Sequence, residues 1–500
     1  MAYTGESIYL SGEEWWREDH LLERVKESEK SEKTMMYLHK FRDMSRPLAS
    51  AIAQLLLANG EKDSSDTPSP RDWNKLLVSE CKMNPQFQML METAMLQFRW
   101  IILSHMITNL SRAAAAAAAA AKSSLALTLD IFAKSLEVGQ SHSRLERLEL
   151  REIELSLAEV TCLGRGLAAA DERSSSRLRS LRLGSIRFLD ANSVSVLADG
   201  LQANGTLENV ELVRCQLSDD QVAMLVDALA ASHPRCCLRK LDLSGNHCRK
   251  FGLRAISSFL AQQHCRLRVL KLNDQFYGQS INHSDLDAVV NPFDVDELLD
   301  GLEENFTLRH LELSLNQLSN VDSLFMMLWK CPNIKFLDLM GNRISRLKSS
   351  STTTCWIQQR LFTSNHRNST RHCSRLQRLE LSHNPFHNLS SQREENARLY
   401  CRLLECHPAL YDAGCGKDSL HQGKQFWKTT SVQAKIQHYL DLNKTFGRTL
   451  VANNQAPLAI WPYVLERANK LFDQKDNSSR QANVIFHLLH TFGVASVGTL

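Results

Sequence analysis

The sequence has little glycine and proline, and its charges almost balance. Its 500 residues include 20 glycines and 11 prolines, and the net charge is +4. The low glycine and proline content excludes a collagen-like or low-complexity chain. The net charge is too small to indicate long-range attraction to nucleic acid or to an anionic membrane, so we expect neither as a partner. Nothing in the composition indicates an oligomeric state.

Long apolar runs are also missing. The most apolar early stretch, residues 94–110, is interrupted by Gln97, Arg99 and His105, and it is shorter than the ~20 apolar residues of a membrane-spanning helix. The first residues lack the basic segment and apolar run of a secretory signal. We therefore expect a location in the cytoplasm, with the nucleus as the alternative.

The motifs of several enzyme classes are absent. The sequence contains no Gly-x-x-x-x-Gly-Lys-Ser/Thr phosphate-binding loop, no His-Glu-x-x-His zinc motif and no Gly-x-Ser-x-Gly nucleophile elbow. It also lacks an F-box-like segment and the aromatic–basic clusters that bind single-stranded nucleic acid. We predict neither catalytic activity nor a cofactor.

The 13 cysteines do not form a clear metal-binding pattern. Soft ligands are densest at Cys401, Cys406, His407, Cys415 and His421. Tetrahedral zinc accepts such ligands, but the short cysteine spacing of zinc sites is not repeated here. We expect structural thiols and no metal.

One short pattern, Leu-x-x-Leu-x-Leu-x-x-(Asn/Cys)-x-Leu, recurs along the chain. Its clearest copies start at Leu178, Leu207, Leu238, Leu267, Leu308, Ile334 and Leu376, with weaker copies at Trp73, Phe98 and Leu145. The first six positions alternate apolar and polar residues, which predicts a half-buried strand; a further strand is expected near residues 36–38. The Asn or Cys at the ninth position is expected to bond the turn that leaves the strand. Three cysteines are expected to point inward: Cys81, Cys215 and Cys248.

Helices are predicted between the strands. Apolar residues at helical spacing indicate helices over residues 193–201, 220–229 and 251–260. The pair Asn204-Gly205 suits a left-handed cap after the first of them. Ser11 and Glu14 fit a capping box that opens an N-terminal helix.

The pattern resembles the leucine-rich repeat family, whose units of ~20–29 residues recur along the chain. Well-formed copies start 29, 31 and 29 residues apart, and such long units resemble the ribonuclease-inhibitor-like type. The resemblance implies a curved α/β solenoid with a parallel concave sheet, outer helices and helical N- and C-terminal caps. The segments IQHYLDLNKTFGRTLV and ANVIFHLLHTFG resemble the tail of leucine-rich repeat proteins predicted in unicellular algae, which implies no known activity.

The predicted organisation has three parts. Residues 1–32 form an N-terminal cap helix, residues 33–396 form the solenoid of about ten or eleven repeats, and residues 397–500 form a helical C-terminal cap or tail. Insertions are expected near residues 61–71, 113–124, 278–292 and 348–374. The third contains polar residues, and the second is rich in alanine.

The candidate binding site lies on the concave sheet, because neighbouring strands align the variable positions of the motif into columns. A basic centre is predicted at Arg179, Arg182, Arg239, Lys240, Arg268 and Lys271. Three apolar residues at solvent-facing positions indicate a protein-binding hot spot: Leu315, Phe336 and Met340. The alternatives are that opposite charges only stabilise a solvated sheet, and that the apolar residues pack against an insertion or the tail.

These observations predict a non-catalytic protein-binding scaffold, whose partner has an acidic surface. The alternative is a GTPase-activating protein resembling the repeat-built activator of the nuclear-transport GTPase. Acceleration of GTP hydrolysis on a panel of small GTPases distinguishes the two. A third hypothesis is a purely structural protein without a fixed partner.

Overall fold

The protein was analysed as a computed structural model. It describes residues 7–11, 35–41, 44–57, 73–81, 85–106, 124–136, 144–170, 177–190, 192–232, 237–275, 294–321, 323–324, 327, 333–344, 376–385 and 412–414. The chain divides into two units, Met1–Leu318 and Ser319–Leu500, and each is described by itself.

Unit 1 contains a parallel sheet whose strands follow the order of the chain, β1-β2-β3-β4-β5-β7-β9-β10-β11-β12. The strands are β1 (Ser7–Ser11), β2 (Met35–His39), β3 (Lys75–Ser79), β4 (Trp100–Ser104), β5 (Arg147–Arg151), β7 (Ser180–Gly184), β9 (Asn209–Val213), β10 (Lys240–Asp242), β11 (Val269–Lys271) and β12 (His310–Glu312). Two short strands, β6 (Glu154–Leu155) and β8 (Arg187–Phe188), pair separately.

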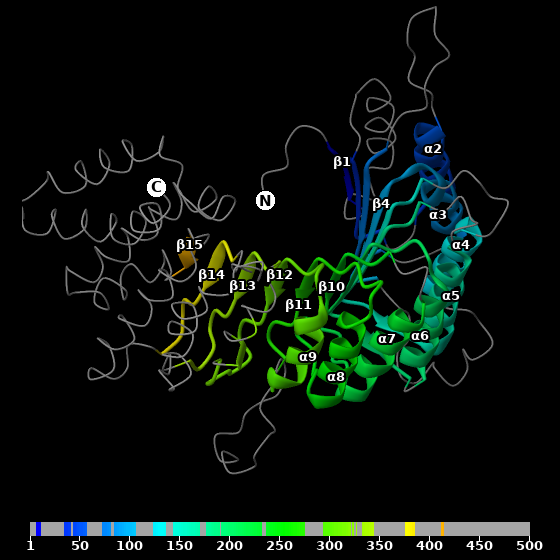
Figure 1. Cartoon of the computed structure of the whole chain (residues 1–500). Helices are drawn as coiled ribbons and strands as arrows, with labels where there is room; N and C mark the ends of the chain where they lie inside the picture. The colour runs from blue at the N-terminus through cyan, green and yellow to red at the C-terminus, as the bar shows by residue number, and fades with distance from the viewer. Residues whose placement is uncertain are drawn as a thin grey trace, which may run out of the picture. The chain divides into compact units, whose positions relative to one another are not determined.

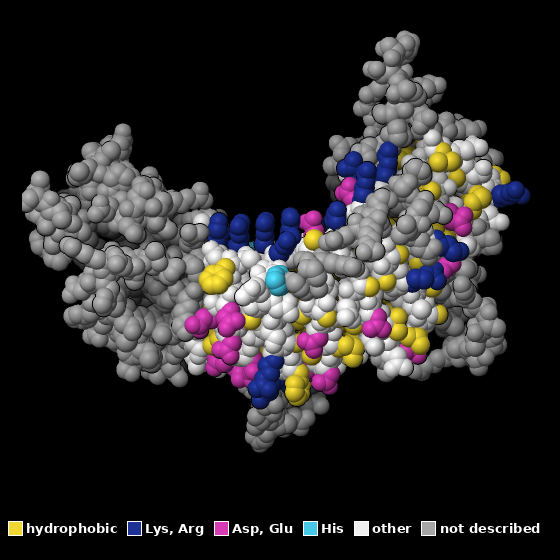
Figure 2. Space-filling view, turned by 45° about the vertical axis from the view of Figure 1, so that its right-hand side comes forward, with side chains coloured by type: hydrophobic (Ala, Val, Ile, Leu, Met, Phe, Trp, Pro, Cys, Tyr) yellow, Lys and Arg dark blue, Asp and Glu magenta, His cyan; other side chains and the backbone are white. Residues whose placement is uncertain are grey.

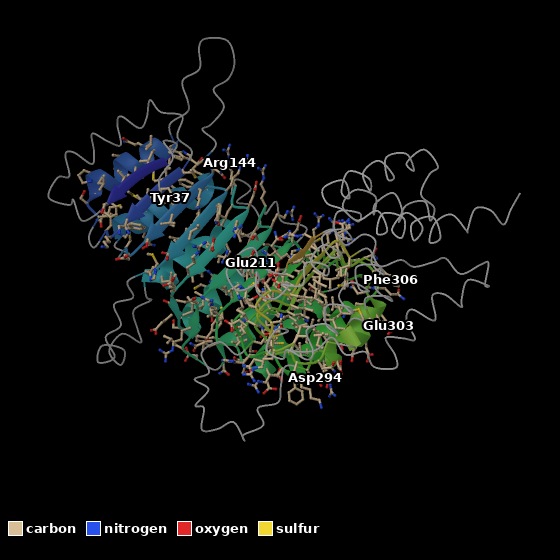
Figure 3. The ribbon with its side chains drawn as sticks, turned by 90° about the vertical axis from the view of Figure 1, so that its left-hand side faces the viewer. Tyr37, Arg144, Glu211, Asp294, Glu303 and Phe306 are labelled. Carbon is tan, nitrogen blue, oxygen red and sulfur yellow. The ribbon has the colours of Figure 1, made fainter. Side chains whose placement is uncertain are left out.

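The helices of unit 1 follow the strands and cover one side of the sheet (Figure 1). They are α2 (Arg46–Leu57), α3 (Pro85–Gln97), α4 (Ser124–Leu136), α5 (Leu157–Ala169), α6 (Ser193–Ala203), α7 (Asp219–Ala231), α8 (Lys250–Leu260) and α9 (Asp296–Glu304). Figure 3 shows Tyr37 and Glu211 on the sheet, and Glu303 and Phe306 by α9. Unit 1 is therefore an α/β solenoid with a curved sheet, as predicted, and the predicted helices over 193–201, 220–229 and 251–260 are confirmed.

The core lies between the sheet and the helices. The fourth and sixth positions of the motif are buried in coil after coil: Leu241 and Leu243, for example, are 0% and 1% exposed. Adjacent coils stack in register, since Leu241 lies opposite Val210 on one side and Leu270 on the other. Each coil thus buries its apolar side against its neighbours, which is how a repeat array gains stability.

The ninth position of the motif bonds the backbone of neighbouring coils, as predicted. The Asn246 side chain donates to the carbonyls of Leu212 and Leu243, both at 2.7 Å, and accepts from the backbone N–H of Cys215 at 3.1 Å and of Leu217 at 3.2 Å. Asn316 and Asn384 make equivalent bonds. Buried backbone groups need such partners, so this position holds the coils together.

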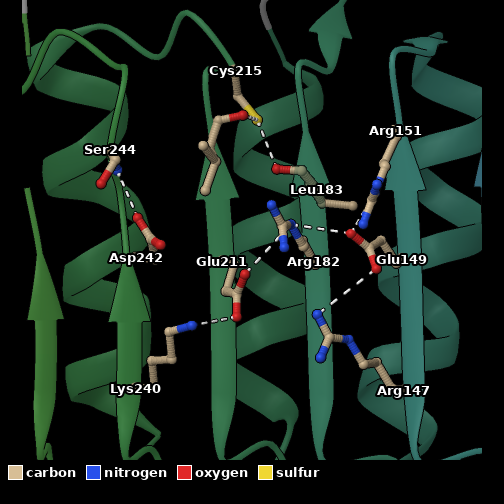
Figure 4. A network of polar contacts seen from close by, with 11 residues as sticks. Arg147, Glu149, Arg151, Arg182, Leu183, Glu211, Cys215, Lys240, Asp242 and Ser244 are labelled. Atoms are coloured by element: carbon tan, nitrogen blue, oxygen red, sulfur yellow. Dashed lines mark hydrogen bonds and ion pairs between the residues drawn. The ribbon is translucent and has the colours of Figure 1, made fainter. Parts of the chain in front are cut away.

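The predicted inward orientation of the cysteines is confirmed. Cys81, Cys215 and Cys248 are buried free thiols. Cys215 takes the place of the asparagine and donates through Sγ to the Leu183 carbonyl at 3.3 Å, as Figure 4 shows. Burial raises the pKa of Cys215 to about 12, which keeps this thiol protonated and unreactive.

A residue with a left-handed backbone conformation, that is a positive φ, follows the strands. The sequence pattern did not predict this conformation. Only two of these positions are glycines, Gly245 and Gly341, with φ of 74° and 65°. The others carry side chains, at Lys40, Glu80, His105, Glu152, Ser185, Arg214, Asp274, Leu315 and His383. Such a φ is unfavourable for residues with a side chain, so packing and the bonds of the turn must hold it.

The predicted left-handed cap at Asn204-Gly205 is wrong. Asn204 is extended, with φ of −80° and ψ of 129°, and Gly205 is not among the residues with positive φ. The Asn204 amide donates to the carbonyls of Leu167 and Ala170, and its oxygen accepts from two backbone N–H groups. Bonding between coils replaces the helix cap, and Asn305 repeats the arrangement.

Unit 2 contains three described strands in the order β13 (Phe336–Asp338), β14 (Arg378–Glu380) and β15 (Asp412–Gly414), and they pair in parallel. β15 lies within the segment 397–500 that was expected to be helical, and β1 lies within the segment 1–32 predicted as a cap helix. Each of these two segments thus contains a strand. The remainder of both caps lies outside the described residues, as do the four predicted insertions except for Ser124, the first residue of α4.

Candidate binding face of the sheet

The fifth position of the motif forms a column across six strands, in which acidic and basic residues alternate except where Glu211 lies beside Asp242. Paired in register are Glu149, Arg182, Glu211, Asp242, Lys271 and Glu312. The column is largely buried: the Glu149 side chain is fully buried, and that of Arg182 is 34% exposed. This confirms the predicted alignment of charged residues on the sheet.

Three cations of the predicted basic centre are paired within this network, and Figure 4 shows two of them, Arg182 and Lys240. Arg182 Nε lies 3.1 Å from Glu149 Oε1 and 3.4 Å from Glu211 Oε2. Lys240 Nζ lies 2.6 Å from Glu211 Oε1, and Lys271 Nζ lies 2.9 Å from Glu312 Oε1. Half-buried pairs of this kind offset each other's charge, so much of the positive charge of these three residues is used inside the sheet.

The ionisation of the column reflects this pairing. Burial raises the pKa of Glu312, but hydrogen bonds from His310, Lys271 and Asn273 outweigh burial and hold the pKa at about 2. Burial likewise opposes ionisation of Glu211, and the bond from Lys240 lowers its pKa below the ordinary value. Both carboxylates are therefore charged at neutral pH, and their contribution to stability is lost only as the pH falls below the ordinary carboxyl range.

The second position of the motif forms a different, more exposed row. From the coil of β7 onward, this position is occupied by Arg179, Glu208, Arg239, Arg268 and Arg309. After Arg179, each of these residues donates its backbone N–H to the carbonyl of the preceding member of the row, over 2.7–2.9 Å. Four guanidiniums and one carboxylate give this row a net charge of +3. Lys and Arg side chains that follow one another in a line are visible in Figure 2.

Neighbouring residues of this row differ in their pairing. Glu208 is shared by Arg239, at 3.3 Å, and Arg179, at 4.0 Å. Arg268 and Arg309 are exposed, and no ion pair joins either of them to another part of the described chain. We call Arg239, Arg268 and Arg309 the arginine row. Arg309 occupies the same column as Arg239 and Arg268, although it does not belong to the predicted basic centre.

The three predicted apolar residues fall into separate units. Leu315 in unit 1 is 47% exposed, as expected for a side chain at a solvent-facing turn. Phe336 and Met340 in unit 2 are partly exposed, and the guanidinium carbon of Arg378 lies 5.1 Å from the centre of the Phe336 ring. A single hot spot made of all three remains a prediction.

The described residues contain no cluster of three or more His, Cys, Asp and Glu side chains with the arrangement of a metal site. The five candidate zinc ligands between Cys401 and His421 lie outside the described residues. No helix of the described part is long and apolar enough to cross a membrane.

Comparisons with known proteins agree with the repeat architecture. A family model described as "Leucine Rich repeat" matches residues 304–322. The ribonuclease inhibitor of Mus musculus is 24% identical over 336 residues, which cover 67% of this chain and 63% of the length of that relative.

Two solved structures were also matched at low similarity. An internalin of Listeria monocytogenes is 14% identical with a TM-score of 0.37, over 76% of this chain and 72% of that one. The structure of a TLR13–ssRNA13 complex is 16% identical with a TM-score of 0.35, over 82% of this chain and 47% of that one.

Proposed function

We propose that this leucine-rich repeat protein of the ribonuclease-inhibitor-like type is a non-catalytic scaffold that binds a protein partner on its concave sheet. The observation that carries the proposal is the arginine row. Its three cations lie on adjacent coils of one stacked sheet, and the row combines exposure with excess positive charge. The repeat match and the ribonuclease inhibitor relative support a protein-binding role.

The arginine row is expected to destabilise the fold of the protein when no partner is bound. Like charges directly opposite each other on adjacent strands are destabilising, and the neighbouring fifth-position column avoids most such contacts by pairing acids with bases. Backbone bonds of 2.7 Å between Arg268 and Arg239 and 2.9 Å between Arg309 and Arg268 fix the row. An acidic partner surface removes the repulsion on binding, which gives the row a physical role.

A preformed sheet also reduces the cost of binding. Side chains presented from stacked coils need little further ordering, so more of the contact energy appears as affinity. The excess positive charge attracts an acidic surface and accelerates association, mainly at low salt. We therefore propose that the partner presents carboxylates to the arginine row.

Charge reversal on the arginine row tests this proposal. The double variant Arg239→Glu/Arg268→Glu is compared with the original chain in affinity capture from cells, using the full chain in both cases. We expect the partner to be lost from the variant at physiological salt, because two attractive contacts become repulsive. Thermal unfolding of both proteins should be similar, since Arg268 and Arg239 are exposed.

A matched control is Arg187→Glu/Arg254→Glu, which changes the charge equally in β8 and α8, outside the concave sheet. These side chains are 68% and 55% exposed and pair with Glu154 and Glu297, and exposed pairs of this kind contribute little to stability. This control should retain the partner. Equal recovery with both double variants would contradict the proposed role of the arginine row. The GTPase-activating alternative is not addressed by the described contacts, and the hydrolysis assay tests it separately.

A further inference from the structure

A second group of residues on the concave sheet, on strands β3 to β7, contains buried polar atoms without a hydrogen-bond partner among the described residues, one of them the acceptor Glu149 Oε2. Three buried donor atoms there have no hydrogen-bond partner among the described residues: Trp100 Nε1, Arg147 Nε and Arg182 Nε. Arg182 Nε lies 3.1 Å from Glu149 Oε1 without the alignment of a hydrogen bond. Buried polar groups are normally paired, so several unpaired donors on neighbouring strands require an explanation.

The same residues carry excess positive charge. The single buried carboxylate of Glu149 serves three guanidiniums, with Arg151 at 2.6 Å, Arg182 at 3.1 Å and Arg147 at 3.7 Å (Figure 4). Lys75 lies on β3, two strands away from Glu149. Burial lowers the pKa of Lys75, and so do the charges of Arg151 and Arg147, whereas the negative charge of Glu149 opposes this shift. One carboxylate cannot balance this set of cations.

Trp100 lies between two of the cations. The register places it opposite Lys75 on one side and Arg147 on the other. Lys75 Nζ lies 4.2 Å and the Arg147 guanidinium carbon 4.5 Å from the centre of a Trp100 ring, both within the range of a cation–π contact. The indole therefore positions both cations on the partly exposed surface of the sheet.

We infer that Lys75, Trp100, Arg147 and Arg151 form a site for a carboxylate of an acidic protein segment. The inference rests on the proposed scaffold function and adds a second contact region to it. The side chains of Arg147 and Arg151 are 30% and 42% exposed, so their outer nitrogens are accessible. A partner carboxylate accepts hydrogen bonds from these outer nitrogens and supplies the negative charge that the group lacks, and Trp and Arg are among the residues enriched at protein hot spots.

A protein segment fits this site better than a nucleic acid. Single-stranded nucleic acid binds through bases stacked on aromatic rings, whereas cations on both neighbouring strands contact the Trp100 ring. The carboxylates of Glu149 and Glu211 lie in the same region and disfavour a continuous polyanion. Separate carboxylates on a polypeptide suit a surface of mixed sign.

The site is distinct from the arginine row. Four strand steps separate β4 from β10 in the sheet of unit 1, which is ~19 Å at the usual strand spacing. Substitutions in one region therefore leave the residues of the other unchanged, and each region is testable by its own variant.

The test is fluorescence anisotropy of a labelled eight-residue peptide of alternating Glu and Leu, titrated with the full chain. The variant Lys75→Gln/Arg147→Gln is compared with the original chain and with the control Arg187→Gln. We expect at least tenfold weaker binding for the first variant, unchanged binding for the control, and no binding of the matching Gln–Leu peptide. Lys75→Gln alone, with an expected loss of about threefold, serves if the double variant does not fold, as judged by circular dichroism.

The outcomes separate this inference from the proposed function. Loss of peptide binding in Lys75→Gln/Arg147→Gln but not in Arg239→Glu/Arg268→Glu supports the second site. Loss only in the latter overturns the second site and leaves the arginine row supported. Absence of peptide binding to the original chain overturns the inference, as does tighter binding of a labelled oligo(dT) of 20 nucleotides that Lys75→Gln/Arg147→Gln abolishes.

Discussion

The variant Leu241→Asp is expected to unfold the central coils of unit 1. Leu241 is fully buried in β10, between Val210 and Leu270 of the adjacent strands. The substitution removes a leucine side chain from the core, which costs about 2–5 kcal/mol, and it buries a carboxylate without a partner, which adds further cost. Because each coil contacts mainly its neighbours, loss of β10 also removes support from β9 and β11.

Two measurements check this expectation. Circular dichroism should show an earlier or additional thermal transition, and limited proteolysis should cleave the chain near residue 241 under conditions in which the original chain is intact. Arg268→Asp is the matched control, since the same side chain enters an exposed position one coil away. A normal melting profile and unchanged proteolysis for Leu241→Asp would show that the assignment of inward and outward positions is wrong.

The variant Asn246→Ala is expected to destabilise unit 1 by roughly 3 kcal/mol or more. Asn246 is fully buried, and its side chain bonds the carbonyls of Leu212 and Leu243 and the N–H groups of Cys215 and Leu217. Truncation leaves these four backbone groups without their partner, and each unsatisfied buried group costs about 1–3 kcal/mol. The cost is partly reduced where the backbone relaxes or water enters.

Denaturant unfolding followed by circular dichroism measures this effect. Asn192→Ala is the appropriate control, because Asn192 is exposed and makes no side-chain cap bond at the start of α6. It should unfold within about 0.5 kcal/mol of the original chain. If Asn246→Ala unfolds at the same denaturant concentration as this control, the ninth position does not connect the coils as described.

Periodicity predicted the inner side of the repeats well. The motif numbering placed Leu241, Leu270 and Leu311 at equivalent positions, and the register pairs them strand by strand. It also placed Cys215 inside, and it predicted the backbone bonds of the ninth position, which Asn246 occupies. These positions are predictable because a core tolerates only apolar or fully bonded side chains, so the requirement repeats in every coil.

The pairing of side chains on the solvent-facing side of the sheet was less predictable, because it depends on distances between atoms rather than on the spacing of residues in the sequence. Lys240 and Arg268 both appear as cations of the basic centre, yet Lys240 bonds Glu211 and Arg268 is exposed. The extra strand β1 was missed because its segment, Ser7–Ser11, has only two inward residues, Ile8 and Leu10. A single short alternation of this kind is too weak a pattern to recognise.

Site-specific photo-crosslinking shows directly whether a protein partner binds the concave sheet. A benzophenone amino acid replaces Asn209, partly exposed on β9 of the concave sheet, or Met224, 43% exposed on helix α7. After irradiation in cells, crosslinked proteins are identified by mass spectrometry. We expect a specific protein partner to be crosslinked from position 209 and not from position 224. A partner crosslinked only from position 224 would place binding on the helical side and contradict a concave binding face.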